Sequence, residues 1–453
     1  MNSNLIQKYN IPGPRYTSYP TVPFWDAEGI AIDVWKKSTI KAFNESNTEE
    51  GISLYIHLPF CESLCTFCAC HKRITKQHRV EEPYIDTVLK EWDLYCDLFK
   101  ELPKIKDIHL GGGTPTFFSA ENLEKLIIGI FKKAEKMPDF ELSFEGHPNN
   151  TTEKQLQVLY DLGSRRNSFG IQDYNPKVQT AIHRIQSFDQ VKKINDLSRK
   201  IGYTSISHDL IFGLPFQTEA TIRDTIKKTI ALKPDRIAYY SYAHVPWIKG
   251  VGQRGFDDND LPKDHEKRHL YELGKQLFFE NGYVEIGMDH FALPTDSLYK
   301  SLKNANLHRN FMGYSSGKTK LMIGLGMSSI SDSWYGFAQN DKKVETYTKT
   351  VNKGEIPIFR GHHLTETDVV IRKHILDLMC TLKTKWNTKL SPEIKNDITS
   401  RLQEMVDDDI LVVSDEGITV KEKGRMFVRN ICMAFDLRLI DKKPETRIFS
   451  MTI

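Results

Sequence analysis

The chain has 453 residues, of which 40% are hydrophobic and 27% charged, so it is long enough for a large folded domain with a smaller one. Its 62 basic and 59 acidic residues leave a formal charge of +3, which excludes the strong field expected of a nucleic-acid or anionic-lipid partner. The start, MNSNLIQKYN, lacks the pattern of a secretory signal, and no apolar run approaches the roughly 20 residues of a membrane span. We therefore expect a cytoplasmic protein with no membrane or nucleic-acid partner, in which clustered thiols serve metal or redox chemistry.

Residues 9–25, YNIPGPRYTSYPTVPFW, are rich in Pro and Tyr, which predicts an extended surface arm. From about residue 50 to 290, short β-branched or aromatic segments alternate with amphipathic helical segments. The six predicted strands are 52–58, 105–110, 140–146, 166–172, 204–212 and 236–244. A further helix at about 264–281 precedes a possible strand at 283–291. The alternation predicts βα units around a parallel sheet, and periodicity alone leaves open a partial TIM-like barrel or a doubly wound sheet.

Polar motifs follow the predicted strands in turn. The cysteines follow the first strand and GGGTPT (111–116) the second; the later strands end in Glu145, Gln172 and Asp173, Asp209, and Tyr242 to His244. Ligands of parallel α/β folds bind at the carboxyl ends of strands. We therefore expect these side chains to lie together at one end of the sheet.

After about residue 340 the alternation stops. Residues 410–420 predict a hairpin around Asp415-Glu416-Gly417, and 422–435 a helix. Helices with a hairpin resemble a winged-helix module, and the balanced charge favours a packing role over nucleic-acid binding. The predicted domains are an arm (1–35), a catalytic barrel (36–340) and a C-terminal helical domain with a hairpin (341–453).

The segment CESLCTFCAC (61–70) holds four of the seven cysteines. Cys61, Cys65 and Cys68 have the spacing C-x3-C-x2-C, whereas structural zinc sites need four ligands, and Cys70 is poorly placed to be the fourth. Three thiolates suit a [4Fe–4S] cluster that leaves one iron open. A zinc-bound scaffold without catalysis stays an alternative. The remaining cysteines, Cys96, Cys380 and Cys432, are predicted to be buried small hydrophobes.

The segment YIHLPFCESLCTFCAC (55–70) resembles the radical S-adenosylmethionine (SAM) enzymes and, among them, the oxygen-independent coproporphyrinogen III oxidases (dehydrogenases). Further ordered matches are GPRYTSYPT, HLGGGTPT, FGIQD, DLIFGLPFQT, GMDHFALP, LHRNFMGY and RNICMAFD. The resemblance implies an α/β fold: a partial (β/α)6 TIM-like radical SAM barrel with an N-terminal arm and a mainly helical C-terminal domain. The resemblance therefore favours the barrel over the doubly wound sheet.

The resemblance also implies the reaction. A 5′-deoxyadenosyl radical takes hydrogen from two propionates of coproporphyrinogen III in turn, carbon dioxide leaves, and vinyl groups remain in protoporphyrinogen IX, a step of haem biosynthesis. The implied cofactors are the [4Fe–4S] cluster and two molecules of SAM. An electron donor and a final acceptor are also required, neither identified by the sequence, and we expect a monomer.

Site residues carry over from the family position by position. Contacts to the first SAM are expected at Tyr55, Gly112, Glu145 and Ile330. Contacts to the second SAM are expected at Phe67, Gly113, Thr114, Gln172, Arg184, Asp209 and Ala243. Glu145 can accept from an ammonium, Asp209 from ribose hydroxyls, and Arg184 can pair with a carboxylate. Cys70 matches a position associated with activity, without an assigned role. Arg15 and Arg309 are candidates for binding propionate.

The chain departs from the family pattern at several positions, namely Ala69, Gly146, His147, Ser164, Arg165 and His183. His147 replaces the usual acid, which leaves the geometry around Glu145 open. Two relatives within the superfamily stay as alternatives. One is a haem-delivery protein, which usually lacks a cysteine at the Cys70 position and the GPRYTSYPT arm. The other is a haem-degrading methyltransferase.

Overall fold

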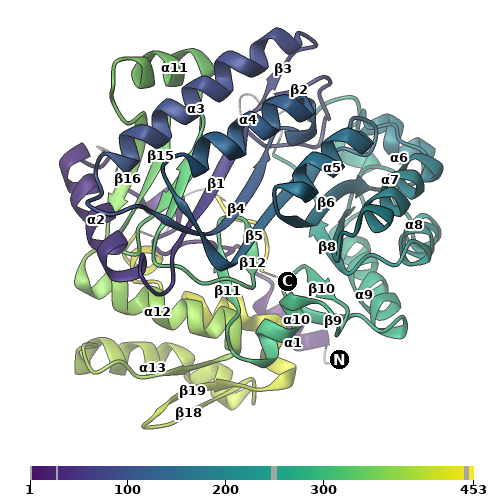
Figure 1. Ribbon diagram of the computed structural model, residues 1–453. Coiled ribbons are helices and arrows are strands. Elements are labelled where there is room, and N and C mark those ends of the chain that lie inside the picture. Colours follow the sequence, from purple (N-terminus) through teal and green to yellow (C-terminus); the bar gives the residue numbers. More distant parts are fainter. Residues whose placement is uncertain (1–2, 27–28, 246–252, 443–447, 453) are drawn as a thin grey trace. The chain divides into compact units, whose positions relative to one another are not determined.

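The computed structural model describes residues 3–26, 29–245, 253–442 and 448–452 (Figure 1). The chain divides into two compact units. The larger contains Ala31–Tyr299 and Thr319–Arg360, and the smaller contains Met1–Ile30, Lys300–Lys318 and Gly361–Ile453. The functional domains predicted as 1–35, 36–340 and 341–453 stay a prediction. None of the helices in the described ranges combines the length and apolar composition needed to cross a bilayer.

Six parallel strands form the centre of the larger unit. They are β1 (Ile52–Leu58), β4 (Lys104–Gly112), β5 (Glu135–Gly146), β6 (Ser164–Gln172), β7 (Ser205–Phe212) and β8 (Arg236–Ser241). Each strand pairs with the next one along the chain, whereas a doubly wound sheet reverses its order at a switch point. The six predicted strands are confirmed, and their order is that of a partial (β/α)6 barrel.

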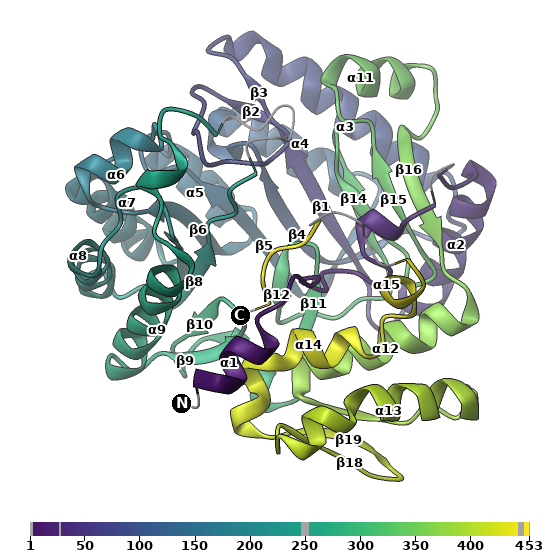
Figure 2. The same cartoon turned by 180° about the vertical axis from the view of Figure 1, so that it is seen from behind.

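Helices connect these strands on one side of the sheet. They are α3 (Glu81–Cys96), α4 (Ala120–Phe131), α5 (Glu153–Asp161), α6 (Pro176–Ala181), α7 (Phe188–Ile201), α8 (Glu219–Ala231) and α9 (Asp264–Glu280), with α2 (Ile32–Ser46) ahead of β1. Figure 1 shows α3, α4 and α5 in front of the sheet, and Figure 2 shows the strands β1, β4 and β5 from the other side. Local sequence sets where several begin, because Ser119, Thr152, Ser187 and Thr218 cap α4, α5, α7 and α8 with their side chains.

The opposite face of the sheet is polar. Alternate strand residues point to opposite faces. On β4, Ile108 and Leu110 are fully buried, whereas His109 is half-buried and contacts the Ser143 hydroxyl of β5 (2.8 Å). Strand register and side-chain contacts place further polar groups on the face of His109, namely Tyr55, Glu145, Ser168 and Asp209. This face is therefore suited to bind a polar ligand.

Short strands extend the sheet beyond β1. β13 (Met322–Leu325) pairs in parallel with β1, and β14 (Ile330–Asp332), β15 (Gly336–Asn340) and β16 (Ile358–His363) follow in order (Figure 2). The sequence analysis did not predict these strands. At the other edge, the predicted strand 283–291 is a hairpin of β9 (Val284–Gly287) and β10 (His290–Ala292). The chain reverses at Met288, which has a left-handed backbone (φ 45°).

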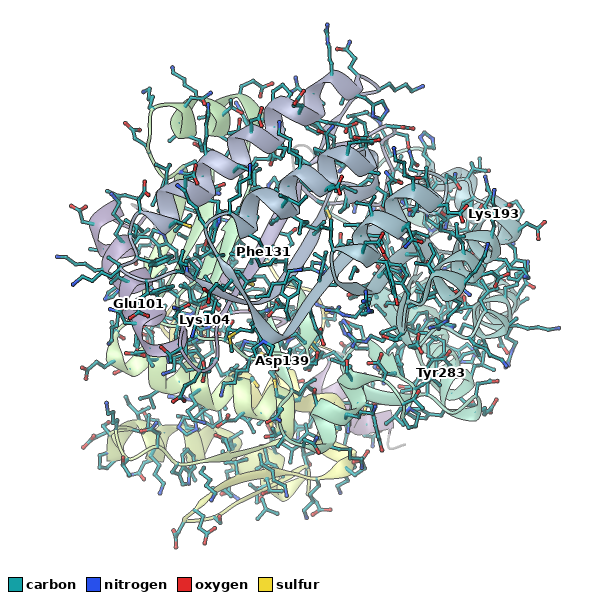
Figure 3. All side chains as sticks on the ribbon, viewed as in Figure 1. Glu101, Lys104, Phe131, Asp139, Lys193 and Tyr283 are labelled. Atoms are coloured by element: carbon teal, nitrogen blue, oxygen red, sulfur yellow. The ribbon has the colours of Figure 1, made fainter. Side chains whose placement is uncertain are left out.

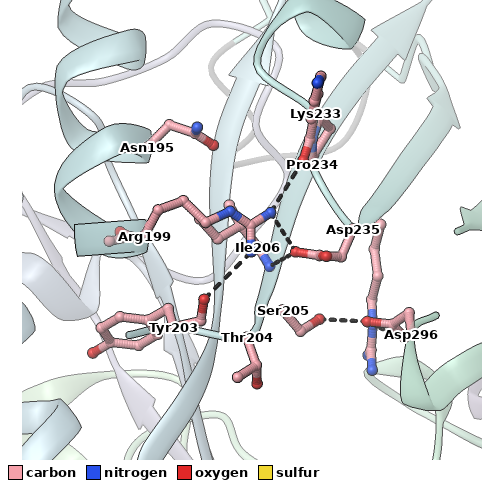
Figure 4. A network of polar contacts seen from close by, with 12 residues as sticks. Asn195, Arg199, Tyr203, Thr204, Ser205, Ile206, Lys233, Pro234, Asp235 and Asp296 are labelled. Atoms are coloured by element: carbon pink, nitrogen blue, oxygen red, sulfur yellow. Dashed lines mark hydrogen bonds and ion pairs between the residues drawn. The ribbon is translucent and has the colours of Figure 1, made fainter. Parts of the chain in front are cut away.

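Polar contacts also fix the amino-terminal ends of β7 and β8 (Figure 4). Arg199 at the end of α7 donates to the carbonyls of Tyr203 (3.3 Å) and Lys233 (3.0 Å) and to Asp235 (2.5 Å). The Asp235 carboxylate also accepts from the Ile206 amide (2.7 Å). The cross-links are distant from the carboxyl ends of the strands and stabilise the scaffold.

The turn between α4 and β5 is held in a similar way. The ring of Phe131, labelled in Figure 3, packs edge-on against Phe140 (centroids 5.3 Å apart). Asp139, also labelled there, forms an exposed ion pair with Lys106 of β4. The apolar contact accounts for most of the attachment, because exposed ion pairs contribute little.

A buried acid joins α3 to the added strands. Glu91 is fully buried and accepts from the Gly326 amide (2.8 Å), the Tyr347 hydroxyl (2.6 Å) and the Asn340 amide group (2.6 Å). Burial raises the pKa of Glu91 to about 7. Gly326 follows β13, Asn340 ends β15 and Tyr347 lies on α11 (Val344–Asn352). One carboxylate therefore secures three segments beside β1.

We expect Glu91→Gln to lower the free energy of unfolding by about 2 kcal/mol, because the new NH2 group faces hydrogen-bond donors that then lose their acceptor. Denaturant unfolding at a pH above 7, where the carboxylate is ionised, measures the change. Glu82→Gln on the same helix is the control, since Glu82 is exposed and, among the described residues, its side chain forms an ion pair with Lys125 alone (3.0 Å). Equal stability of the two variants would contradict the assigned role of Glu91.

The smaller unit contains both the N-terminal and the C-terminal segment of the chain. Its elements are α1 (Ser3–Tyr9), β11 (His308–Asn310), β12 (Gly313–Ser315), α12 (Glu366–Thr381), β17 (Lys383–Lys385), α13 (Pro392–Asp407), β18 (Leu411–Val413), β19 (Gly417–Val420), α14 (Val428–Met433) and α15 (Leu437–Asp441), while α10 (Ser297–Lys303) leads into it. The predicted hairpin is confirmed as β18 and β19, and β17 adds a third strand. The predicted helix 422–435 begins as a 3₁₀ helix, Glu422–Phe427.

The N-terminal arm is part of this unit's interior. Tyr16 and Tyr19 are buried, and Tyr16 donates to Asp436 (3.1 Å). Arg429 donates to the carbonyls of Pro14 (2.9 Å) and Met451 (2.7 Å). The expectation of a surface arm is therefore wrong, because its aromatic residues fill the core around α14.

Candidate active site

The cysteine loop begins and ends beside β1. β2 (Phe60–Cys61) pairs in parallel with β3 (Arg73–Ile74), and the Arg73 amide donates to the Pro59 carbonyl (2.8 Å). Cys61, Cys65 and Cys68 are half-buried and Cys70 is exposed. Both ends of the loop are thus held by backbone hydrogen bonds, independently of the thiols.

Hydrogen-bond donors approach the thiols from the segments after β4 and α6. The Thr114 hydroxyl lies 3.3 Å from Cys61 Sγ, and Arg184 Nη1 donates to Cys65 Sγ (3.7 Å). Burial raises the pKa of Cys61 to about 11, whereas a hydrogen bond from Cys70 lowers that of Cys68 to about 6. In the described ranges, no three His, Cys, Asp or Glu side chains already converge as ligands of one metal ion. Three half-buried thiols on one loop, with donors near their sulfurs, fit a [4Fe–4S] cluster.

The glycines after β4 lie against the cysteine loop. A Cβ on Gly113 would lie 2.5 Å from the Pro59 carbonyl oxygen and 3.0 Å from Cys61 Sγ. Gly112 has φ 119°, and a Cβ there would lie 2.9 Å from the Leu58 nitrogen. Only glycine therefore allows the backbone after β4 to pass so close to the cysteine loop.

At the carboxyl end of β1, a chain of hydrogen bonds links Tyr55 to the cysteine loop. The Tyr55 hydroxyl lies 3.1 Å from His57 Nδ1, and His57 Nε2 lies 2.8 Å from the His71 carbonyl. Burial lowers the pKa of His57 to about 4, so the ring is neutral and Nε2 carries the proton that it donates to the carbonyl. Tyr55 must then donate to Nδ1. Beside it, His109 Nε2 lies 3.3 Å from Glu145 Oε1.

A second group of polar side chains lies near the carboxyl ends of β6 and β7. Arg184 donates to the Gly170 carbonyl (2.6 Å), and Gln172 adopts a left-handed backbone (φ 67°) where β6 ends. Ser168 donates to Asp209 (2.8 Å), yet desolvation raises the pKa of Asp209 to about 7. His147 lies near Arg184, and burial together with that cation lowers the pKa of His147 to about 3. A neutral imidazole thus lies near this guanidinium.

An apolar cluster closes this end of the sheet beside the cysteine loop. Phe67 packs against the buried side chains of Val178, Ile182, Leu214 and Tyr242. These come from α6 and from the loops after β7 and β8. The adjacent Ala243 accepts from Gln253 through its carbonyl (2.7 Å).

The structure places the candidate residues along one end of the sheet. All eleven proposed SAM contacts lie in the larger unit, as do the four loop cysteines. Ile330 starts β14, where its backbone would contact a Cβ on Gly324. Arg15 and Arg309 belong to the smaller unit, in which Arg309 donates to the Arg15 carbonyl (3.1 Å). Their role in binding propionate stays a prediction, as do the roles of the other site residues.

Sequence reasoning missed several residues at this end of the sheet. His57 and His109 lie within predicted strands, and alternation with neighbouring buried residues was the signal that could have placed them on the polar face. Lys342 follows β15 and Arg360 lies on β16, and the sequence analysis predicted neither strand. Lys72 on the cysteine loop donates to the Cys68 carbonyl (2.9 Å).

Together, the one-directional βα sheet and the three-thiol loop at its carboxyl end are the features of a radical SAM protein, and residues 55–229 match the Radical SAM superfamily. The chain is 37% identical over 447 residues to the oxygen-independent coproporphyrinogen III oxidase of Helicobacter pylori, with 96% of each chain covered. It is 35% identical to that of Escherichia coli, covering 97% and 95%. The chain belongs to the oxygen-independent coproporphyrinogen III oxidase family.

The solved structure of the Escherichia coli coproporphyrinogen III oxidase, described as a radical SAM enzyme, agrees with this chain at a TM-score of 0.88. The two share 32% sequence identity, and the match covers 96% of this chain and 98% of the other. The fold predicted from the resemblance is therefore confirmed.

Proposed function

We propose that the protein performs the anaerobic oxidative decarboxylation of two propionates of coproporphyrinogen III, giving protoporphyrinogen IX for haem biosynthesis. Relatives that carry this enzyme's name match along nearly the whole chain. The observation that carries the proposal is the loop that presents three thiols, and no more than three in the family spacing, beside the glycines after β4.

In this proposal, Cys61, Cys65 and Cys68 hold the [4Fe–4S] cluster. When bound, the cluster and SAM supply a one-electron cleavage that yields an organic radical able to take a hydrogen atom from a propionate β-carbon. Thr114 and Arg184 donate toward the sulfurs, which favours the thiolate form. The apolar cluster around Phe67 shields this end of the sheet from water.

We assign two SAM molecules to two groups of residues. The first molecule contacts Tyr55, Gly112, Glu145 and Ile330, and the Glu145 carboxylate accepts from the ammonium group. The second contacts Phe67, Gly113, Thr114, Gln172, Arg184, Asp209 and Ala243, with Arg184 on the carboxylate and Asp209 on the ribose. The hydrogen bond between Cys70 and Cys68, with the charge of Cys68 and desolvation, holds the pKa of Cys70 well above its ordinary value, so Cys70 is assigned here as a thiol.

A pH dependence follows from Asp209. The ionised carboxylate is the better acceptor for ribose hydroxyls, and its pKa of about 7 means that it is protonated below that pH. We expect SAM affinity to rise from about pH 6 to about pH 8, by up to about tenfold. Equilibrium binding to the reconstituted protein measures it. Asp209→Asn should remove the rise, and the same slope in that variant would contradict the assignment.

The proposed reaction also requires an electron donor and an electron acceptor. Each decarboxylation removes two electrons, of which one leaves with the hydrogen atom and one passes to a separate acceptor. A further donor must reduce the cluster. We propose a cytoplasmic monomer that binds neither nucleic acid nor membranes.

Anaerobic incubation of the reduced, reconstituted protein with SAM and coproporphyrinogen III tests the function. We expect protoporphyrinogen IX, carbon dioxide and 5′-deoxyadenosine. Tight haem binding without carbon dioxide release would contradict the proposal and favour haem delivery. Methylated or ring-opened haem would favour the haem-degrading reaction, and stoichiometric zinc without acid-labile sulfide would favour the scaffold.

A further inference from the structure

The added strands β13 to β16 bring two cations to the end of the sheet that carries the cysteine loop. β14 runs antiparallel to β13 and to β15, so β15 ends at the same edge as β1. Lys342 lies two residues after the end of β15. The Asp341 amide donates to the Pro357 carbonyl (2.8 Å), which brings the start of β16, and with it Arg360, to the same edge.

Strand register puts Arg360 on the polar face. Tyr55 pairs with Gly324, a Cβ on Gly324 would contact Ile330, and Ile330 pairs with Gln339. Paired residues share a face of the sheet. Arg360 Nε donates to Gln339 Oε1 (2.7 Å), so the guanidinium belongs to the row that begins at Tyr55. Three strand spacings separate β1 from β15, which is about 14 Å.

The orientation of Arg360 is fixed before any ligand binds. Gln339 is buried, and its amide group donates to the Ser328 carbonyl (3.0 Å). The Gln339 oxygen is therefore directed at Arg360 Nε. A guanidinium whose orientation is already fixed binds a carboxylate with little further loss of side-chain entropy.

Lys342 is half-buried, and no carboxylate lies within ion-pair distance of it in the described part of the chain. Its ammonium lies 5.0 Å from the ring centroid of Phe359, a contact that supports the charge without neutralising it. The two nearest acids along the chain have other partners, since Glu345 pairs with Arg73 (3.0 Å) and Asp341 accepts from Thr350 (3.5 Å).

Two cations held near each other lower the stability of the fold. Desolvation and the charge of Arg360 both lower the pKa of Lys342. The same two charges, with Lys72, act on His71 of the cysteine loop and add to the effect of its burial in lowering its pKa. A partly desolvated pair of this kind becomes favourable when an anion binds near both cations.

We propose that Lys342 and Arg360 bind a propionate carboxylate at the rim of the tetrapyrrole, distant from the propionate that reacts. This inference rests on the proposed function. The four carboxylates of coproporphyrinogen III are spread around its rim, so one can pair with the cations while another lies near the cluster. An acidic electron-donor protein is a poorer fit, because both cations are recessed and Arg360 belongs to the polar face.

Binding of coproporphyrin III, a stable fluorescent form of the tetrapyrrole, to the reconstituted protein tests the inference. We expect Lys342→Gln and Arg360→Gln each to raise its Kd about tenfold. Lys343→Gln is the matched control, because Lys343 is the adjacent, exposed lysine. The tetramethyl ester of coproporphyrin III should bind all four proteins alike, since it has no carboxylate to pair.

With dithionite as reductant, the two variants should raise KM for coproporphyrinogen III with little change in kcat. Cluster content and SAM cleavage without substrate should match the wild type, which separates binding from misfolding. Arg360→Lys, which keeps the charge but not the planar fork, should recover part of the affinity.

Three results would overturn the inference: Kd values equal to that of Lys343→Gln, equal losses with the ester, or a defect seen only when a reduced flavodoxin replaces dithionite. If the wild type releases no carbon dioxide from coproporphyrinogen III, the proposed function fails instead. If the wild type is active and the variants bind normally, only the inference fails.

Discussion

Replacing Cys65 with alanine is expected to abolish assembly of the [4Fe–4S] cluster and to reduce turnover to background, while the chain stays folded. The loop ends are held by backbone hydrogen bonds, from Arg73 to Pro59 and from Thr75 to Cys61 (2.9 Å), that do not involve this thiol. Two remaining thiolates leave the cluster without its third ligand. Iron and acid-labile sulfide after anaerobic reconstitution measure assembly, and circular dichroism checks the fold.

The control for this variant is Cys96→Ala. Cys96 is half-buried on α3, and its only described hydrogen bond is a weak one to the Lys133 carbonyl (3.8 Å). This variant should keep its iron and its activity. Full iron content and activity in Cys65→Ala would refute the three-thiolate model.

Replacing Arg184 with alanine is expected to weaken SAM binding by about 10- to 100-fold, the usual cost of losing a charge-assisted pair. Arg184 lies between the Gly170 carbonyl and Cys65 Sγ, so its guanidinium is positioned between β6 and the cysteine loop. Cluster content should remain, because the three thiols are untouched. Equilibrium binding of SAM and the SAM dependence of 5′-deoxyadenosine release measure the effect.

Arg165→Ala provides the comparison, since Arg165 is an exposed residue of β6 whose guanidinium stacks on Tyr160 (3.8 Å). It should bind SAM as the wild type does. An Arg184→Ala variant with unchanged SAM affinity, or one that loses its cluster, would contradict the assignment of Arg184 to the second SAM.

The six central strands could be predicted because each contains β-branched or aromatic residues and alternates with amphipathic helices, several of which have recognisable caps. β14, by contrast, is the three-residue segment Ile330–Asp332, and β13 and β15 are scarcely longer. Such segments form strands here because β1 offers an unpaired edge, and this long-range condition leaves no periodic signal. The hairpin at 283–291 was missed for a related reason: Met288 adopts a left-handed backbone that its sequence does not require.

Part of the candidate site could likewise be predicted from the sequence, and part of it could not. The spacing of Cys61, Cys65 and Cys68 is local, so sequence alone indicates the cluster. The hydrogen bond from Tyr55 to His57, and the row that joins Tyr55 to Arg360, depend on register across several strands. No sequence window contains that register, so Lys342 and Arg360 could not be proposed from the sequence.

Mössbauer spectroscopy of protein reconstituted with isotopically enriched iron, before and after addition of SAM, tests the three-thiolate site most directly. We expect a cubane in which a single iron changes its signal when SAM is added, because that iron has no cysteine ligand. Four irons that stay equivalent and indifferent to SAM would contradict the account.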